Sequence, residues 1–220
     1  MNQLDLFSEH LPEGKNNLSI LSKIDGLKYI DNYISQDEHN VMVSNIDKMP
    51  WLSDLKRRVQ HYGFKYDYKK RSIDYSMYLG PFPEWLAALS DRLYFEKLIE
   101  YIPDQVIVNE YLPGQGIANH IDCEPCFSDT IISLSLLSSC VMDISNKNAP
   151  QDKIEVLLQP RSLIVLSRDA RYQWSHGIPS RMTDKFEGLK IIRDRRISLT
   201  FRKVILQNAN AAIPGANCVI

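Results

Sequence analysis

The second half of the chain consists of short apolar segments separated by polar turns, a pattern that predicts β-strands. After Pro103, runs rich in Val, Ile and Leu alternate with turn-forming pieces such as Pro113–Gly116 and Asn146–Asp152. Strands that follow one another without intervening helices favour an antiparallel sandwich or jelly roll. The segments expected to be strands are Val106–Tyr111, Thr130–Leu137, Val141–Ile144, Ile154–Leu158, Ser162–Leu166 and Ile197–Ile205.

The first half of the chain has helical patterns instead. Ser35 and Glu38 have the spacing of a capping box, which predicts a helix from this point to about Lys48. A second helix is expected to begin near Pro83 and Glu84, because proline is favoured in the first turn of a helix. Its apolar stripe consists of Trp85, Leu86, Leu89 and Leu93.

No internal repeat and no linker divides the 220 residues, so we expect one domain that is large enough to bury a full core. Residues 1–26 are polar and aperiodic, and we expect them to form a flexible N-terminal tail. The domain is expected to cover residues 27–205, followed by a C-terminal tail at 206–220. The predicted fold class is mainly β with some helix (α+β), a jelly roll with flanking N-terminal helices.

The composition is that of a soluble globular protein, with 44% apolar and 24% charged residues. There is no continuous apolar stretch of about eighteen residues, so no segment is expected to span a membrane. The N-terminus lacks both the basic stretch and the apolar stretch of a secretory signal. We therefore expect a cytoplasmic protein.

The four cysteines are too few for a disulfide framework, and a reducing environment is expected. Cys123 and Cys126 form a C-x-x-C pair, which is a common half of a zinc site. A second such pair is missing, so a tetrahedral zinc site is not expected. Both residues are predicted to be ordinary thiols.

The net charge of −1 conceals two basic segments. Residues 51–75 contain seven Lys or Arg against three Asp, and residues 161–203 contain eleven against four acidic residues. Such segments either form one basic face for a polyanion or lie scattered around the surface. Charge counting leaves both interpretations open.

His120 and Asp122 form the most compact group of potential metal ligands. Side chains two residues apart on an extended segment point the same way, so this imidazole and carboxylate can reach one ion. His176, from a later strand, would supply the third ligand. Two histidines and one carboxylate leave open positions on a metal, the arrangement of non-haem Fe(II) oxygenases. The alternative is a hydrogen-bonded surface pair of His120 and Asp122.

The last predicted strand carries polar side chains on one face and apolar side chains on the other. Arg196 and Arg202 lie at the two ends of the polar face, with two hydroxyl residues between them. A buried arginine needs an anionic partner, and a dicarboxylate supplies two carboxylates that suit arginine's planar fork. Asn109 and Tyr111 are a similar polar pair on another apolar strand. The alternative is a solvent-facing strand with ordinary arginines.

Together these residues resemble the signature of the AlkB family of Fe(II)/2-oxoglutarate-dependent dioxygenases. The resemblance extends from about Gly26 to Lys203, and several stretches are most similar to the branch that hydroxylates a wobble uridine in transfer RNA. The family motifs are Asn109-x-Tyr111-x-Pro113-Gly114, His120-x-Asp122, His176 and Arg196-Ile-Ser-Leu-Thr-Phe-Arg202. The branch motifs are Gly114–Ile117, Phe127–Leu136, Pro160–Leu163 and Arg171–Gly177.

The resemblance implies a double-stranded β-helix that uses Fe(II), 2-oxoglutarate and O2. It makes His120, Asp122 and His176 both the iron ligands and the catalytic residues. These three residues would therefore lie together at the centre of the site.

The resemblance also implies which residues bind 2-oxoglutarate. Arg202 would pair with the distal carboxylate, with Tyr111 nearby. Arg196 and Asn109 would hold the end near the metal.

The implied activity is the oxidation of modified nucleobases. Hydroxylation of an N-methyl group gives an unstable product that loses formaldehyde, whereas hydroxylation of a carbon-bound methylene gives a stable alcohol. We expect oxidative demethylation of alkylated bases in DNA or RNA, with hydroxylation of a modified wobble uridine in tRNA as the first alternative. An oxygenase that acts on a protein side chain or a small molecule is a further alternative. A non-catalytic binding module of the same fold is the last.

A nucleobase must leave its stack to reach a recessed metal, which requires stacking surfaces and phosphate contacts. Residues 60–78 interleave aromatic and basic side chains, at the position where the family carries its nucleotide-recognition lid. The segment is therefore a candidate for binding single-stranded nucleic acid or a flipped base. The alternative is simple packing, with Phe64, Tyr66 and Tyr68 on one face of a strand.

The N-terminal peptide Gln3-Leu4-Asp5-Leu6-Phe7 resembles the short motif by which bacterial DNA-processing enzymes bind the sliding clamp. Such a peptide binds because apolar anchors on a flexible tether fill an apolar pocket. The alternative is that these side chains pack on the protein's own surface. The sequence does not indicate an oligomeric state.

Overall fold

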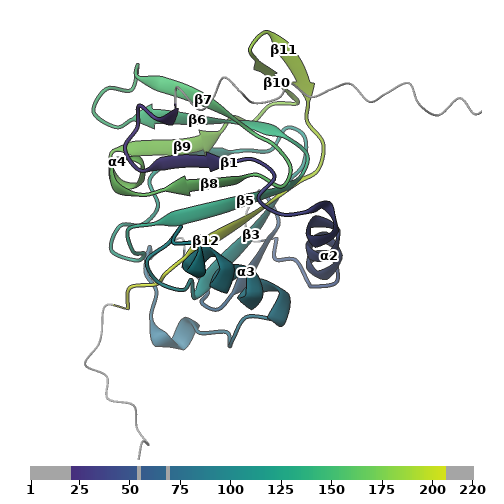
Figure 1. The fold of residues 1–220 in the computed structure, drawn as a ribbon, viewed down its shortest axis with the longest axis vertical. Helices are drawn as coiled ribbons and strands as arrows, with labels where there is room; N and C mark the ends of the chain where they lie inside the picture. Colours follow the sequence, from purple (N-terminus) through teal and green to yellow (C-terminus); the bar gives the residue numbers. More distant parts are fainter. Residues whose placement is uncertain (1–20, 54–55, 68–69, 207–220) are drawn as a thin grey trace, which may run out of the picture.

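Two antiparallel β-sheets face each other in the computed structural model, which describes residues 21–206 except 54–55 and 68–69 (Figure 1). The larger sheet has the order β1 (Leu27–Ile30), β8 (Leu163–Leu166), β5 (Ile131–Leu137), β12 (Arg196–Arg202), β3 (Gln105–Tyr111) and β2 (Val59–Tyr62). The smaller sheet has the order β4 (Ile117–His120), β9 (Trp174–Ile178), β6 (Cys140–Asn146) and β7 (Lys153–Leu158). A hairpin of β10 (Thr183–Phe186) and β11 (Leu189–Ile192) stands apart. This mainly β architecture confirms the predicted jelly roll.

Alternation along β12 sends its side chains to two environments. Ile197, Leu199 and Phe201 are completely buried against the helices that cover the larger sheet. Arg196 and Arg202 face the cavity between the two sheets. The polar face therefore lies inside the protein, and the alternative of a solvent-facing strand is wrong.

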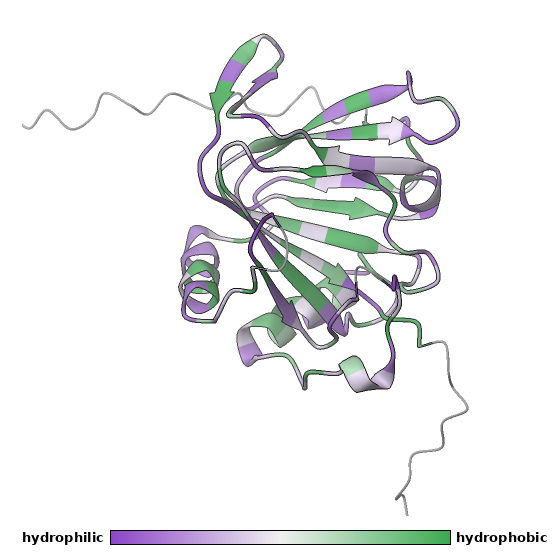
Figure 2. Cartoon of the chain, turned by 180° about the vertical axis from the view of Figure 1, so that it is seen from behind, coloured by the Kyte–Doolittle hydropathy of each residue, from purple (hydrophilic) through white to green (hydrophobic). Residues whose placement is uncertain are grey.

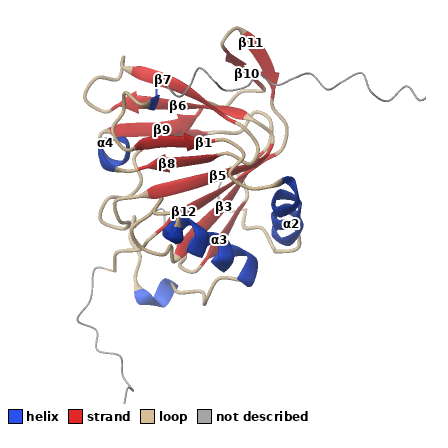
Figure 3. Cartoon of the chain, in the orientation of Figure 1, coloured by secondary structure: helices blue, strands red, loops and turns tan. Residues whose placement is uncertain are grey.

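Helices α2 (Gln36–Asp47) and α3 (Glu84–Phe95) cover the outer face of the larger sheet (Figure 3). The predicted capping box opens α2: the Ser35 hydroxyl accepts from the Glu38 N–H, and the Glu38 carboxylate accepts from the Ser35 N–H. Both helices are amphipathic, and the strands beneath them carry long apolar stretches (Figure 2). The residues that the helices bury are His39, Met42, Ile46, Leu86, Leu89, Ser90 and Leu93.

Residues 21–26, which the sequence pattern assigned to the N-terminal tail, include residues that pack against the domain. Leu21 and Ile24 are 3% and 4% exposed and belong to the core between the sheets. Gly26 has a φ of +81°, and a Cβ at this position would lie 2.0 Å from the Ser167 carbonyl oxygen. Only glycine allows this approach. Two apolar anchors in a polar stretch form no period, so the sequence pattern did not reveal them.

Every predicted strand is present, and the strand ends differ from the predicted ends by no more than three residues. The strands that were not predicted are short, and their apolar residues do not alternate over a useful length. The clearest example is β4, whose sequence Ile-Ala-Asn-His has one large apolar residue. Of two shorter helices, η1 (Tyr75–Met77) lies between β2 and α3, and α4 (Arg168–Tyr172) connects β8 to β9.

The second basic segment does not form a uniform basic face, because several of its arginines are ion-paired. Arg193 donates two hydrogen bonds to the buried carboxylate of Asp184, at 2.6 and 2.8 Å. Arg195 pairs with both Glu110 and Asp47. Asp184 also accepts a hydrogen bond from the Val141 N–H of β6 at 3.1 Å, which ties the β10–β11 hairpin to the smaller sheet. Among the described residues, no helix is long and apolar enough to cross a membrane.

Candidate metal and co-substrate site

Two imidazoles from paired strands and a carboxylate from the following loop meet inside the barrel. His120 ends β4 and pairs with His176 of β9, and the two ring centroids lie 4.5 Å apart. One carboxylate oxygen of Asp122 lies 3.6 Å from Nε2 of His176. The potential ligand atoms of all three residues lie within 4.8 Å of one another. The structure therefore brings together the three residues that the sequence predicted as metal ligands.

Both histidines are suited to bind a metal through Nε2. Burial, reinforced by the neighbouring His120, lowers the pKa of His176 to about 4, so its ring is neutral near pH 7. Nδ1 of His120 lies 2.9 Å from the Ala118 carbonyl oxygen, and an N–H there donates to that oxygen. This bond orients the ring and leaves Nε2 as the free lone pair, as in many metal sites.

Asp122 remains ionised although it is buried. Burial alone would raise its pKa, but the positive field of Arg202 holds the pKa well below its ordinary range. Arg202 Nη2 donates to Asp122 Oδ1 at 2.6 Å. The other oxygen, Oδ2, has no hydrogen-bond partner among the described residues. A bound cation would satisfy this oxygen, because buried carboxylate oxygens are costly without a partner.

A cavity of about 680 Å³ lies between the sheets, and the three ligands line it. This volume is within the usual range of small-molecule sites. The residues of β12 and β3 that line it are Arg196, Ser198, Thr200, Arg202, Ile107, Asn109 and Tyr111.

Arg196 lies beside Tyr111 on the neighbouring strand and is only 2% exposed. Its Nη2 donates to the Ser135 hydroxyl at 2.8 Å, but its Nε and Nη1 have no partner among the described residues. The guanidinium carbons of Arg196 and Arg57 lie 5.5 and 5.7 Å from the Tyr111 ring centroid. Arg57 also donates to the Asn109 side-chain oxygen at 2.8 Å. Arg196 is therefore a buried cation with no anionic partner among the residues that the structure describes.

The two arginines of β12 lie in the opposite order to the one that the resemblance implied. Arg202 contacts the metal ligand Asp122, whereas Arg196 lies beside Tyr111. Six residues of extended strand separate the Cα atoms of the two arginines by roughly 20 Å. Each arginine therefore belongs to a different end of the cavity. Tyr111 therefore lies beside Arg196 and not beside Arg202 as expected, while the part of 2-oxoglutarate that each arginine binds stays a prediction.

Iron and 2-oxoglutarate fit the groups that this site presents. Among the described residues, Oδ2 of Asp122 and the Nε and Nη1 atoms of Arg196 have no hydrogen-bond partner. A cation would satisfy the oxygen, and an anion would satisfy the two nitrogens. A dicarboxylate that reaches from the metal toward Arg196 would supply that anion.

The aromatic and basic segment at 60–78 is divided between packing and the cavity. Phe64 is buried, and Tyr62 packs edge-on against a tryptophan of α3. Tyr66 and Arg71 line the cavity. Tyr68 lies outside the described residues. The segment therefore contains both packed residues and residues that line the cavity, and its role as a lid stays a prediction.

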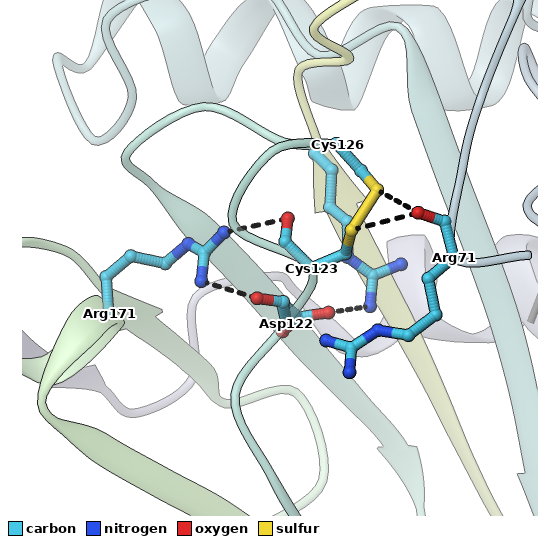
Figure 4. Close-up of a disulfide and its surroundings, with 6 residues drawn as sticks. Arg71, Asp122, Cys123, Cys126 and Arg171 are labelled. Carbon is cyan, nitrogen blue, oxygen red and sulfur yellow. Dashed lines mark hydrogen bonds and ion pairs between the residues drawn. A yellow bond between two sulfur atoms is a disulfide. The ribbon is translucent and has the colours of Figure 1, made fainter.

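Cys123 and Cys126 form a disulfide directly behind Asp122 (Figure 4). The prediction that both are ordinary thiols was wrong, because a tight turn brings their Cα atoms within 5.3 Å. The two sulfurs lie 3.5 and 3.1 Å from the Arg71 carbonyl oxygen. The loop that carries the carboxylate ligand thus contacts the segment that contributes Arg71 to the cavity.

Sequence reasoning assigned no role to Arg57 or Arg171, and the structure places both at the site. Arg57 was one residue of a basic segment, and nothing local distinguished it from its neighbours. Arg171 lies in a motif that carried the family resemblance, but its contacts are with the backbone of a distant loop. Contacts between residues that are far apart in the sequence depend on the fold, so the spacing of residue types along the chain does not reveal them.

Comparisons with known proteins agree with this geometry. Residues 20–202 match the family model described as the 2OG-Fe(II) oxygenase superfamily. An uncharacterised protein L905 of Acanthamoeba polyphaga mimivirus is 37% identical over 83% of this chain and 86% of its own length. The Arabidopsis thaliana protein named alkylated DNA repair protein ALKBH8 homolog is 35% identical over 82% of this chain.

Two further relatives bear on length and fold. The mouse protein named tRNA (carboxymethyluridine(34)-5-O)-methyltransferase ALKBH8 is 35% identical over 81% of this chain. The chain spans only 59% of the Arabidopsis protein and 30% of the mouse protein. A solved structure titled "The structure of OsALKBH1" has a TM-score of 0.61 at 16% identity and covers 81% of this chain and 98% of its own, which supports the fold.

Proposed function

This chain belongs to the 2OG-Fe(II) oxygenase superfamily and is AlkB-like, and from that premise we propose that it oxidatively demethylates alkylated bases in DNA or RNA. The observation that carries the proposal is one cavity lined by three potential iron ligands, by the buried Arg196, and by Tyr66 and Arg71. The three ligands suit iron, and Arg196, whose Nε and Nη1 have no hydrogen-bond partner among the described residues, suits the co-substrate. Tyr66 offers a stacking surface and Arg71 a cation, the groups that bind an unstacked nucleotide.

His120, Asp122 and His176 would hold Fe(II) on one side and leave its other positions to ligands. When bound, iron with 2-oxoglutarate and O2 supplies the oxidising power for hydroxylation. Arg202 keeps Asp122 ionised and fixes the direction of its carboxylate through Oδ1, so that Oδ2 is available to the metal.

Arg196 would bind the distal carboxylate of 2-oxoglutarate through Nε and Nη1, with Tyr111 alongside. Asn109 and Arg57 extend this polar subsite. Since the guanidinium group is already buried, water is largely excluded from this end of the cavity. The resulting contact would be strong, because charge-assisted hydrogen bonds gain strength in a low-dielectric site.

Demethylation follows from the product of hydroxylation. An alcohol on an N-methyl carbon is unstable, so the C–N bond breaks, formaldehyde leaves, and the base regains its proton. The protein need only present the methyl carbon to the open side of the metal. Tyr66, whose ring lies 5.5 Å from that of Phe127 at the cavity, is suited to stack against the base and hold it there.

Hydroxylation of a modified wobble uridine in tRNA is the second candidate. It is favoured by the relative whose name describes a carboxymethyluridine methyltransferase. The chain covers less than a third of that relative, so this activity stays a proposal alongside demethylation. Both substrates lie inside the cell, in line with the cytoplasmic location expected from the sequence.

A substrate panel separates the candidates. The protein is incubated with Fe(II), 2-oxoglutarate and ascorbate on methylated single-stranded DNA, methylated RNA and tRNA, and the nucleosides are analysed by mass spectrometry. Loss of methyl supports demethylation, and a gain of one oxygen on uridine supports the second candidate. Turnover of 2-oxoglutarate without either change would reject both and favour a protein or small-molecule substrate. Absence of 2-oxoglutarate binding would favour a non-catalytic module.

We also propose that Gln3–Phe7, which lies outside the described residues, docks on a sliding clamp. The support is the resemblance of this peptide to clamp-binding motifs. The double variant Leu6→Ala with Phe7→Ala should lose clamp binding in a pull-down and retain turnover on free substrate. Equal retention of the clamp by the double variant would rule the proposal out.

A further inference from the structure

Arg171 is a completely buried arginine close to the candidate iron site. It lies in α4, a short helix that precedes the strand carrying His176. The residue is 2% exposed and is among the largest buried side chains of the described residues. Burial lowers the pKa of its guanidinium group. The group is nevertheless a cation, because arginine is not deprotonated in proteins. A charge in this position requires a structural reason, because burying a guanidinium group is costly.

The guanidinium group donates its hydrogen bonds to backbone carbonyls of a single loop. Nη1 donates to the Asp122 carbonyl oxygen at 2.9 Å, and Nη2 donates to that of Cys123 at 3.3 Å (Figure 4). Nε lies 3.4 Å from the carbonyl oxygen of Ser128. Among the described residues, no carboxylate lies within salt-bridge distance of Arg171. Its charge is therefore directed at the main chain of the loop at 122–128.

The three contacts join both ends of this loop. Asp122 and Cys123 begin it and Ser128 ends it, so one rigid planar group fixes the separation between the two ends. The disulfide closes the middle of the same loop and contacts Arg71 from the other side. The direction of the Asp122 side chain depends on its own backbone. Arg171 is therefore placed to set the orientation of the carboxylate without touching it.

We propose that Arg171 is a positioning residue for the iron ligand Asp122. By holding the carbonyls of Asp122 and Cys123, it keeps the carboxylate aimed at the point where it meets His120 and His176. The proposal rests on the iron site of the proposed function and not on the identity of the substrate.

Metal affinity tests the proposal without any nucleic acid. We compare Arg171→Met and Arg171→Lys with the wild-type protein by calorimetric titration of Fe(II) under anaerobic conditions. Methionine fills the space without donors, and the lysine ammonium is a point charge that cannot bond three separated carbonyls. Both variants should bind Fe(II) about 10- to 100-fold more weakly, the usual effect of losing a group that orients a metal ligand. The KM for a nucleic-acid substrate should change far less at saturating iron.

Arg168→Met is the matched control, because Arg168 begins the same helix but is exposed and pairs only with Asp25. Its iron affinity should equal that of the wild type. Guanidinium ion at a non-denaturing concentration should restore iron affinity to Arg171→Ala and leave Arg168→Met unchanged. This rescue distinguishes positioning from a general loss of stability.

Wild-type iron affinity in a folded Arg171→Lys or Arg171→Met protein would overturn the proposal, even if the melting temperature fell. If Arg171→Met does not fold, Arg171→Lys and the guanidinium rescue decide the question, and absence of rescue counts against it. If the proposed nucleic-acid substrate is wrong, the iron titrations and the nucleoside analysis give a different combination of results. In that case wild-type protein still binds iron and the Arg171 variants still bind it weakly, while no nucleoside changes in mass.

Discussion

Replacing Arg196 by methionine should have opposite effects on the ligand-free protein and on 2-oxoglutarate binding. In the absence of ligand the guanidinium group is buried, with one hydrogen bond to Ser135 and two nitrogens without partners. An unpaired buried ion costs several kcal/mol, partly offset here by the Ser135 bond and the contact with Tyr111. We therefore expect Arg196→Met to raise the free energy of unfolding of the ligand-free protein by on the order of 1 kcal/mol.

The loss of co-substrate affinity should be much larger. The two unpaired nitrogens would each form a charge-assisted hydrogen bond worth about 1.5–3 kcal/mol. Their removal should cost about 3–6 kcal/mol, which corresponds to roughly 10²- to 10⁴-fold weaker binding of 2-oxoglutarate. Iron affinity should be almost unchanged, because Arg196 does not contact the metal ligands.

Urea denaturation with and without 2-oxoglutarate and a redox-inert divalent metal measures both effects on one sample. Wild-type protein should be stabilised strongly by 2-oxoglutarate, and Arg196→Met hardly at all. Arg202→Met is the matched comparison: it leaves the buried Asp122 carboxylate without its cation and should destabilise the ligand-free protein by about 3–5 kcal/mol. The reasoning is refuted if Arg196→Met destabilises the ligand-free protein to the same degree and retains wild-type affinity for 2-oxoglutarate.

Three further changes test other parts of the protein. Tyr66→Ala with Arg71→Ala should raise the substrate KM roughly 10- to 100-fold and leave the KM for 2-oxoglutarate unchanged; equal KM values for the substrate would contradict a role in binding. Cys126→Ser should lower the free energy of unfolding by only about 2 kcal/mol in denaturant titrations, because the disulfide closes a very short loop; no change would contradict the bond. The pKa of Asp184 is held below its ordinary value of 3.8 because hydrogen bonds, chiefly from Arg193, outweigh the opposing effect of burial. The ionised carboxylate therefore stabilises the fold above pH 3.8, and this contribution is lost as the pH falls through the lowered pKa. Asp184→Asn should make the free energy of unfolding depend less steeply on pH in the acid range. An unchanged pH dependence would refute this prediction.

The fold could be predicted where apolar residues repeat over a sufficient length. The strands that became β3, β5, β6 and β12 are long and strongly patterned, so their existence and their two faces followed from the sequence. β4 could not be predicted, since its four residues carry almost no apolar signal and it is held by pairing with β9. Pairing between distant segments is a property of the folded chain.

The candidate site divides in the same way. His120 and Asp122 lie two residues apart, so their shared direction was a local inference, and the alternating face of β12 identified Arg196 and Arg202. Which arginine lies near Asp122 depends on the direction of β12 relative to the loop at Asp122, and the family resemblance implied the opposite order. The disulfide was missed because a C-x-x-C pair reads equally as two thiols until a turn is known to bring the sulfurs together.

The most direct test of the central claim is a pair of anaerobic calorimetric titrations, of Fe(II) into the protein and then of 2-oxoglutarate into the iron-loaded protein. The account predicts one iron per chain and one 2-oxoglutarate that binds tightly only after iron. His176→Ala should abolish both steps, because it removes one of three ligands that converge within 4.8 Å. Iron-independent binding of 2-oxoglutarate, or wild-type iron binding by His176→Ala, would contradict the claim that these residues form the oxygenase centre.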